Sequence, residues 1–205
     1  MNELRATFGS IDIYLFDQLL RGQIRPGCRV VDAGCGFGRN IHYFLRSGYD
    51  VFAFDSDAVA VADVKRMAAE LAPQLPPDHV RHETVEQCSL PDGLADVVIS
   101  SAVLHFARDD AQFAAMLTGT WRLVAPGGLL FCRLASTIGI ASLVHPLAPD
   151  GRRCRLPDGT DRYLVDQALL LEWTGRLGGQ LVDPLKTTVV QDLRAMTTWV
   201  VRRPA

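Results

Sequence analysis

The sequence has 205 residues, which is enough for one domain of ordinary size and leaves little room for a second. Hydrophobic residues make up 48% and charged residues 21% of the chain, a composition that excludes an intrinsically disordered protein. The formal net charge of -2 at pH 7 gives no overall positive field, so neither nucleic acid nor a membrane is expected as a partner.

The sequence carries no pattern typical of export or of membrane insertion. Charged and polar residues interrupt the N-terminal segment, which argues against a signal peptide, and no apolar run approaches the roughly 18 residues of a membrane span. The cysteines are odd in number and form no C-x-x-C pair, so neither a disulfide framework nor a metal site is indicated. They are Cys28, Cys35, Cys88, Cys132 and Cys154. We therefore expect a cytoplasmic protein without a bound metal.

Short β-branched runs alternate with segments of helical periodicity, a pattern typical of an α/β domain with a mostly parallel sheet. Residues 11–19 carry apolar side chains at helical spacing and predict an N-terminal helix that ends before Pro26. Further helices are predicted over residues 38–46, 58–71, 110–124 and 164–177. Strands are predicted over residues 29–32, 51–55, 80–84, 96–101, 129–134, 180–190 and 195–202.

Two segments depart from this alternation. Residues 136–162 have no clear periodicity and contain several prolines and glycines, so they are interpreted as a long excursion. Segments of this length are usually either functional or disordered, and the sequence leaves both alternatives open. Pro184 lacks a backbone donor, which places its strand at a sheet edge or at a bulge. We divide the predicted single domain, residues 1–205, into an N-terminal flap (1–27), a core (28–135), the excursion (136–162) and a final helix with a strand pair (163–205).

The most informative segment is the loop after the first strand, Asp32-Ala-Gly-Cys-Gly-Phe-Gly-Arg-Asn40. Its glycines allow a sharp turn from strand to helix and let a ligand approach the backbone. A nicotinamide-binding fingerprint, G-x-G-x-x-G, would require a glycine where Arg39 stands, which disfavours an NAD-dependent oxidoreductase. Asp55 follows 21 residues after Gly34 (55 - 34 = 21) and ends the next strand, at the spacing of a carboxylate that binds ribose hydroxyls. The alternative role for Asp55 is a helix N-cap, for which Asp57 is the better candidate.

These residues resemble the first motif and the ribose-binding acid of class I S-adenosylmethionine-dependent methyltransferases. The segments 86–91, 96–105 and 123–128 are similar to later motifs of that family. The resemblance implies a Rossmann-like, doubly wound sheet of seven strands in the order 3-2-1-4-5-7-6, with strand 7 antiparallel, and S-adenosyl-L-methionine as the cofactor. The cofactor-binding residues that it implies are Asp32, Gly34, Cys35, Gly36, Gly38, Asn40, Asp55, Ser56, Glu86, Gln87 and Ser101.

Within that family, Gly36-x-Gly38-Arg39-Asn40 and Gly48-Tyr49-Asp50-Val51 look most like the tellurite-resistance-type and thiopurine-type small-molecule enzymes. This resemblance suggests a tellurium, selenium or thiol acceptor. The sequence itself leaves open the identity of the acceptor, its reacting atom and the oligomeric state.

Methyl transfer needs an aligned nucleophile and the exclusion of water more than it needs acid catalysis, so no catalytic triad is expected. His105 is the candidate catalytic residue, as a general base or a substrate contact, although it could equally cap a turn. The arginines near the excursion either clamp an oxyanion or form a solvated face. We hypothesise that the excursion and the N-terminal helix, with Phe8 and Tyr14, close over the acceptor. The candidate substrate residues are Tyr14, His105, Arg133, Arg152, Arg153 and Arg155.

The sequence thus predicts a methyltransferase that acts on a small molecule by in-line displacement. One alternative is a non-catalytic protein that binds S-adenosylmethionine or S-adenosylhomocysteine. Another is a protein or RNA methyltransferase, but the fourth strand is followed by Ser101-Ala102-Val103-Leu104 rather than by the polar-Pro-Pro-aromatic motif of many nucleobase-methylating enzymes.

Overall fold

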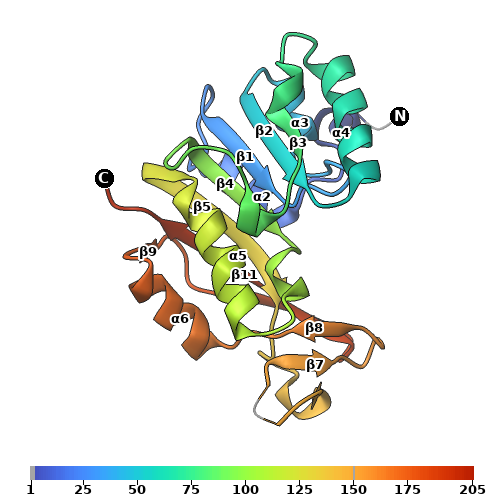
Figure 1. Ribbon diagram of the computed structural model, residues 1–205, viewed down its shortest axis with the longest axis vertical. Helices are drawn as coiled ribbons and strands as arrows, with labels where there is room; N and C mark the ends of the chain where they lie inside the picture. Colours follow the sequence, from blue (N-terminus) through green and yellow to red (C-terminus); the bar gives the residue numbers. More distant parts are fainter. Residues whose placement is uncertain (1–2, 150) are drawn as a thin grey trace.

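Eight strands within residues 3–149 and 151–205, the part of the chain that the computed structural model describes, form one mixed sheet (Figure 1). The strand order is β10-β11-β5-β4-β1-β2-β3, with β9 paired to β11. The neighbours from β3 to β5 are parallel, whereas β11 is antiparallel to β5, β9 and β10. The strands are β1 (Arg29–Ala33), β2 (Asp50–Asp55), β3 (Val80–His82), β4 (Ala95–Ser101), β5 (Val124–Ala135), β9 (Gln180–Leu181), β10 (Lys186–Val190) and β11 (Arg194–Arg202). This order confirms the expected Rossmann-like topology, with β10 and β11 in the places of the sixth and seventh strands. The sheet has eight strands among the described residues rather than the seven expected, because β9 adds to β11 as a further strand.

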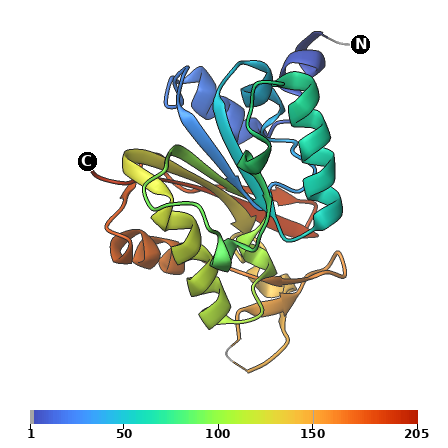
Figure 2. The same cartoon turned by 45° about the horizontal axis from the view of Figure 1, so that its top comes forward.

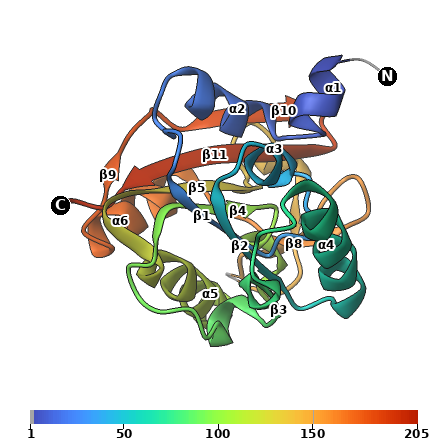
Figure 3. The ribbon, with the colours of Figure 1, turned by 90° about the horizontal axis from the view of Figure 1, so that it is seen from above.

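Helices cover both faces of the sheet. The side chains of β1 and β4 alternate between two buried clusters, so that Val31 and Val98 face one layer while Val30 and Val97 face the other. This burial on both faces explains why the central strands read as continuous apolar runs. Figure 3 shows α5 and α6 on one side of the sheet and α2 and α3 on the other. The helices are α1 (Glu3–Phe8), α2 (Ile13–Leu20), α3 (His42–Arg46), α4 (Ala58–Leu71), α5 (Asp110–Arg122) and α6 (Gln167–Arg176).

Aspartate side chains fix where four of the helices begin, among them α2, where Asp12 accepts a hydrogen bond from the backbone N–H of Tyr14. Asp57 accepts hydrogen bonds from the backbone N–H groups of Val59 and Ala60 at the start of α4, which confirms its predicted role as an N-cap. Asp109 and Asp166 cap α5 and α6 in the same way. These aspartates therefore provide acceptors for backbone N–H groups that have no partner within the helix.

No helix among the described residues has the length and apolar character needed to cross a membrane.

Several predicted boundaries were wrong. The N-terminal segment contains two helices, α1 and α2, because the chain turns at Gly9 with φ of +62°. The helix predicted from residue 38 begins at His42, since Gly38 has φ of +75°, outside the helical region. The strand predicted over residues 180–190 is divided into β9 and β10, and Pro184 lies in the gap between them. β10 is an edge strand, which agrees with the expected position near the sheet edge.

The excursion after β5 is also more regular than expected. It contains a separate three-stranded antiparallel sheet in the order β6-β7-β8, which extends beyond the carboxyl end of the main sheet (Figure 2). These strands are β6 (His145–Pro146), β7 (Arg153–Arg155) and β8 (Asp161–Tyr163). Strands of two or three residues are too short to produce a detectable period of two. Four 3-10 turns occur in the described residues: η1 (Pro77–His79), η2 (Val85–Gln87), η3 (Leu104–Phe106) and η4 (Ala141–Leu143).

Candidate active site

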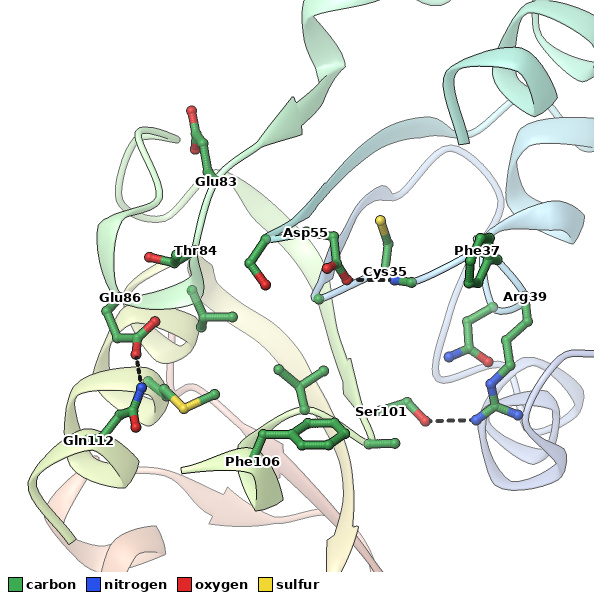
Figure 4. A pocket seen from close by; sticks show the side chains of 18 residues that line it. Cys35, Phe37, Arg39, Asp55, Glu83, Thr84, Glu86, Ser101, Phe106 and Gln112 are labelled. Carbon is green, nitrogen blue, oxygen red and sulfur yellow. Dashed lines mark hydrogen bonds between the residues drawn. The ribbon is translucent and has the colours of Figure 1, made fainter. Parts of the chain in front are cut away.

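A cavity of about 560 Å³ lies at the carboxyl ends of β1, β2 and β4 (Figure 4). The carboxyl ends of parallel strands meet at one edge of the sheet, and in open α/β sheets ligands bind outside this edge. The cavity collects eight of the predicted cofactor residues: Gly34, Cys35, Gly36, Asn40, Asp55, Ser56, Glu86 and Ser101. Three others, Asp32, Gly38 and Gln87, are not part of its lining.

The glycine loop forms one wall of the cavity, and its glycines have different roles. Gly34 has φ of +82°, and a Cβ at this position would lie 2.6 Å from a methyl group of Val103, so a side chain cannot be accommodated. Gly36 also has a positive φ, of +50°, but a Cβ there would meet no atom within 4 Å. Because Gly36 lines the cavity, the space beside it is where a ligand can approach the backbone. A Cβ at Gly38 would press against Met67 and Val64 of α4, so that glycine serves helix packing.

Asp55 ends β2 beside the glycine loop and has a fixed orientation. Its Oδ2 accepts a 2.8 Å hydrogen bond from the backbone N–H of Gly36, and its Oδ1 accepts one of 2.9 Å from the backbone N–H of Asp57. A carboxylate oxygen has more than one lone-pair site, so both oxygens retain acceptor capacity toward the cavity. The carboxylate is thus held in place and remains able to receive hydroxyl donors.

Glu86 lies on η2, on the wall opposite the glycine loop. Its Oε1 accepts a 2.8 Å hydrogen bond from Nε2 of Gln112, a residue of α5 (Figure 4). The amide oxygen of Gln112 in turn accepts hydrogen bonds from the backbone N–H and the Nε of Arg108. This relay orients the Gln112 amide, so that its nitrogen faces Glu86. Glu83, also on this wall, is bound to the backbone N–H and hydroxyl of Ser89 instead.

Asp32 is buried beneath the loop, with 1% of its surface exposed, and its Oδ2 has no hydrogen-bond partner among the described residues. Burial raises the pKa of this carboxyl to about 7 from an ordinary value of 3.8; the positive charge of Arg39 opposes the shift, and the negative charge of Asp55 adds to it. An unpaired buried acceptor is costly. Asp32 therefore has unused capacity to accept a hydrogen bond or to pair with a cation.

Arg39 connects the cavity to the N-terminal segment. Its Nη2 donates to the hydroxyl of Ser101 at 3.1 Å and lies 3.4 Å from Oδ2 of Asp12. The Asp12 side chain is fully buried and also pairs with Arg133 at 2.7 Å. In the sequence, Arg39 argued against a dinucleotide fingerprint and formed part of the submotif that resembles small-molecule methyltransferases, but neither Arg39 nor Asp12 was predicted to lie in the site.

Cys35 lies in the glycine loop but is buried, and burial strongly raises the pKa of its thiol, with smaller contributions from the nearby carboxylates Asp32 and Asp55. A thiol is a poor nucleophile unless it ionises. The environment of Cys35 thus favours a packing role beside the cavity.

A second cavity, of about 390 Å³, shares Ala102 and Phe106 with the first. Two of the candidate substrate residues, His105 and Arg133, line it. The other four line neither cavity. Arg152 pairs with Asp166, Arg153 donates to the carbonyl of Ala107, Arg155 pairs with Asp161, and the hydroxyl of Tyr14 lies 2.8 Å from that of Thr188.

Phe8, which we expected to close over the acceptor with Tyr14, stacks on Tyr43 of α3 with ring centroids 5.0 Å apart. The N-terminal helices therefore pack against the core and β10 through these aromatic residues. These contacts hold α1 and α2 against α3 and β10.

The sequence reasoning missed several residues that line the first cavity. Phe37 stands inside the glycine motif, so its position could have been noticed. No sequence signal links Gln112 or Met116 to this site, because both reach it from α5 through the packing of that helix beside η2. The other missed lining residues are Arg39, Glu83, Thr84, Val85, Val103 and Phe106.

The chain resembles known proteins in both sequence and fold. Residues 31–132 match a family model described as a methyltransferase domain. A malonyl-[acyl-carrier protein] O-methyltransferase of Serratia marcescens is 33% identical over 124 residues, which cover 60% of this chain and 43% of that protein. A ubiquinone biosynthesis O-methyltransferase of Maricaulis maris is 32% identical over 141 residues, which cover 67% of this chain and 52% of that protein. The chain thus spans about half the length of these curated relatives.

The fold also has counterparts among solved structures. A 1,6-didemethyltoxoflavin-N1-methyltransferase of Burkholderia thailandensis, crystallised with 1,6-didemethyltoxoflavin and S-adenosylhomocysteine, superposes with a TM-score of 0.72 at 17% identity. The match covers 99% of this chain and 82% of that one. At this identity the similarity establishes the fold.

Proposed function

We propose, from the membership of this chain in the class I S-adenosylmethionine-dependent methyltransferases, that it transfers a methyl group from S-adenosylmethionine to a small-molecule acceptor. The observation that carries the proposal is the open space beside Gly36, which faces a cavity of about 560 Å³ with the Asp55 carboxylate at its edge. A nucleoside can lie against the backbone at Gly36, because no Cβ blocks it there, while its ribose hydroxyls donate to the fixed carboxylate of Asp55.

The residues of the cavity fit the parts of the cofactor. Asp55 would accept hydrogen bonds from the ribose hydroxyls, and Glu86, oriented by Gln112, would accept one from the adenine amino group. Asp32 lies beneath the glycine loop, outside the cavity lining, and its unpaired Oδ2 would accept a hydrogen bond from a cationic amino group that reaches the loop. When bound, the cofactor supplies a methyl group on a positively charged sulfur, which is a good leaving group.

The remaining task of the protein is to position the acceptor and exclude water. The acceptor atom must lie in line behind the methyl group, so that its bond to carbon forms as the carbon–sulfur bond breaks. Two partly exposed aromatic residues, Phe37 and Phe106, line the cavity and are suited to covering bound groups. This arrangement requires no acid catalyst.

His105 is unsuited to the role of a general base that its sequence position suggested. Its Nδ1 accepts a 3.2 Å hydrogen bond from the backbone N–H of Ala135, so the proton of the neutral ring is on Nε2. Burial, reinforced by the positive charge of Arg162, lowers the pKa of His105 to about 4. At neutral pH, Nε2 of His105 therefore carries the proton and is a hydrogen-bond donor, not a base.

The relatives described above act, by their names, on malonyl-[acyl-carrier protein] and in ubiquinone biosynthesis, so we do not propose a tellurite- or thiopurine-type acceptor. We propose a cytoplasmic location only because all five cysteines are unpaired.

The test combines binding and turnover. Calorimetry should show that the protein binds S-adenosylhomocysteine, and incubation with methyl-labelled S-adenosylmethionine and a fractionated metabolite extract should transfer label to a low-molecular-weight product. Absence of cofactor binding would refute the proposal. Binding without transfer to any fraction would support the non-catalytic alternative, and label on protein or RNA would indicate a macromolecular acceptor.

A further inference from the structure

The second cavity lies beside the first at the same edge of the sheet. Its walls come from η3, the end of β5, the β7–β8 hairpin and the turn between β10 and β11. Ala102 and Phe106 line both cavities, so a molecule in the second cavity lies next to the space assigned to the cofactor. This position suits a methyl acceptor.

The charged groups of this cavity are predominantly positive. Among the described residues its lining contains three arginines, Arg133, Arg162 and Arg194, and one carboxylate, Asp158. Arg194 lies 3.7 Å from Asp158, so these two charges offset each other in part. Arg133 is paired with the buried Asp12, which also lies near Arg39.

Arg162 differs from the other two arginines. It makes no ion pair among the described residues; its Nη1 donates to the carbonyl of Asp161, and its guanidinium lies 4.8 Å from the ring centroid of Phe106. A carbonyl and an aromatic face leave most of its five donors without a charged partner. Arg162 lowers the pKa of Asp158 and of Asp161 through its charge but forms an ion pair with neither, so it provides a positive charge that the protein offsets only in part.

Two further donors point to the same ligand chemistry. The Nε2–H of His105 makes no hydrogen bond among the described residues, and the Nε of Arg133 is buried without a partner. The hydroxyl of Thr160 donates to Asp158, which removes the acceptor capacity of that carboxylate in part. The cavity thus has more unmet donors than acceptors.

We propose that the second cavity binds a carboxylate group of the methyl acceptor, with Arg162 as its cationic partner and the Nε2–H of His105 as an additional donor. Planar guanidinium groups bind carboxylates with good geometry, and charge-assisted hydrogen bonds are the stronger kind. This inference rests on the proposed methyltransferase function, because it assigns the cavity to the acceptor. It differs from the clamp that the sequence suggested, since Arg152, Arg153 and Arg155 do not line the cavity.

The test uses benzoate and its neutral isostere benzamide as probes, titrated into the full chain by two-dimensional NMR at low salt. We expect benzoate to bind about tenfold or more tightly than benzamide, with the largest shifts at Thr160, Arg162 and Ala135. Arg162→Gln should abolish the preference, and Arg162→Lys should retain part of it. Arg66→Leu, an exposed change of the same net charge on α4, should leave it unchanged.

Equal binding of the two probes, or a preference that survives in Arg162→Gln, would overturn the inference. The titrations are run with and without S-adenosylhomocysteine, whose own binding is measured separately. Loss of S-adenosylhomocysteine binding contradicts the proposed function, whereas its normal binding without a benzoate preference contradicts only the carboxylate site. If Arg162→Gln does not fold, Arg162→Lys and the wild-type probe preference still decide the matter.

Discussion

The backbone N–H of Gly36 donates a 2.8 Å hydrogen bond to Oδ2 of Asp55. This contact joins the glycine loop after β1 to the end of β2, so the two parts of the candidate cofactor site have a fixed separation. A site held in this way does not have to be ordered when a ligand binds. The relationship also means that a change at either residue affects the other.

Asp55→Ala removes the proposed ribose partner, and the hydroxyls of a bound nucleoside then have no acceptor there. We expect S-adenosylhomocysteine to bind about 1–3 kcal/mol more weakly, measured by calorimetry. The matched control is Asp57→Ala, two residues away. It removes the cap of α4 and should lower the free energy of unfolding by about 1 kcal/mol while leaving affinity unchanged. Equal affinity of Asp55→Ala and the parent would refute the ribose assignment.

Gly36→Ala should abolish most cofactor binding while leaving the protein folded. The added methyl group meets no protein atom and projects into the cavity, so the cost to folding is that of the positive φ alone, about 1 kcal/mol. Gly48→Ala is the control, because Gly48 has φ of +74° and equally open surroundings but lies outside the cavity. Thermal unfolding and calorimetry of both variants test this pair; similar affinities in the two would contradict the prediction.

Gln112→Met should weaken cofactor binding although Gln112 is not expected to be a principal cofactor ligand. The substitution keeps the length of the side chain but removes the hydrogen bond that orients Glu86. We expect a loss of about 1 kcal/mol in binding free energy. In a protein that already carries Glu86→Gln, the Gln112→Met substitution should cost less binding free energy than it does in the parent. Strictly additive losses in this double-mutant cycle would show that Gln112 does not act through Glu86.

Asp32→Asn should change how stability depends on pH. The folded-state pKa of Asp32, about 7, lies above the ordinary value of 3.8, so between these values the folded protein binds the additional proton and its stability falls as pH rises. At pH 8 the parent contains a buried charge that the variant lacks, and the Asp32→Asn protein should be more stable by about 2–4 kcal/mol. At pH 5 the difference should be much smaller. Urea unfolding without cofactor at both pH values provides the measurement, and a difference that does not depend on pH would argue against the raised pKa.

His105 should remain neutral, with its proton on Nε2, from pH 5.5 to 8. Its pKa is lowered to about 4, and the backbone N–H of Ala135 occupies Nδ1. A long-range ¹H–¹⁵N NMR spectrum distinguishes the two ring nitrogens and should show one tautomer throughout this range. A midpoint near the ordinary value of 6.5 would mean that the ring is accessible to water and free to act as a base. As pH decreases, His105 takes up its proton at a higher pH in the unfolded chain than in the folded protein. The free energy of unfolding should therefore fall as pH decreases from 6.5 toward 4.

The amino-acid sequence alone predicted the central strands, the glycine loop and the position of Asp55 at the end of the second strand. Each of these features rests on a local pattern: an apolar strand buried on both faces, glycines where the backbone needs positive φ, and an acid at the end of the following strand. Such patterns survive in a single sequence because the residues involved are close along the chain.

Only the tertiary structure decided which side chains meet across the cavities. Gln112 contacts Glu86 because α5 packs beside η2, and Arg39 shares Asp12 with Arg133 because α2 packs near the end of β5. The arginines of the excursion show why the sequence could not predict which side chains line the second cavity. Alternate side chains of β8 face opposite ways, so that Arg162 lines the second cavity while Asp161 pairs with Arg155 on β7. In a strand of three residues that alternation leaves no periodic signal, so its direction is set by the pairing of β8 with β7.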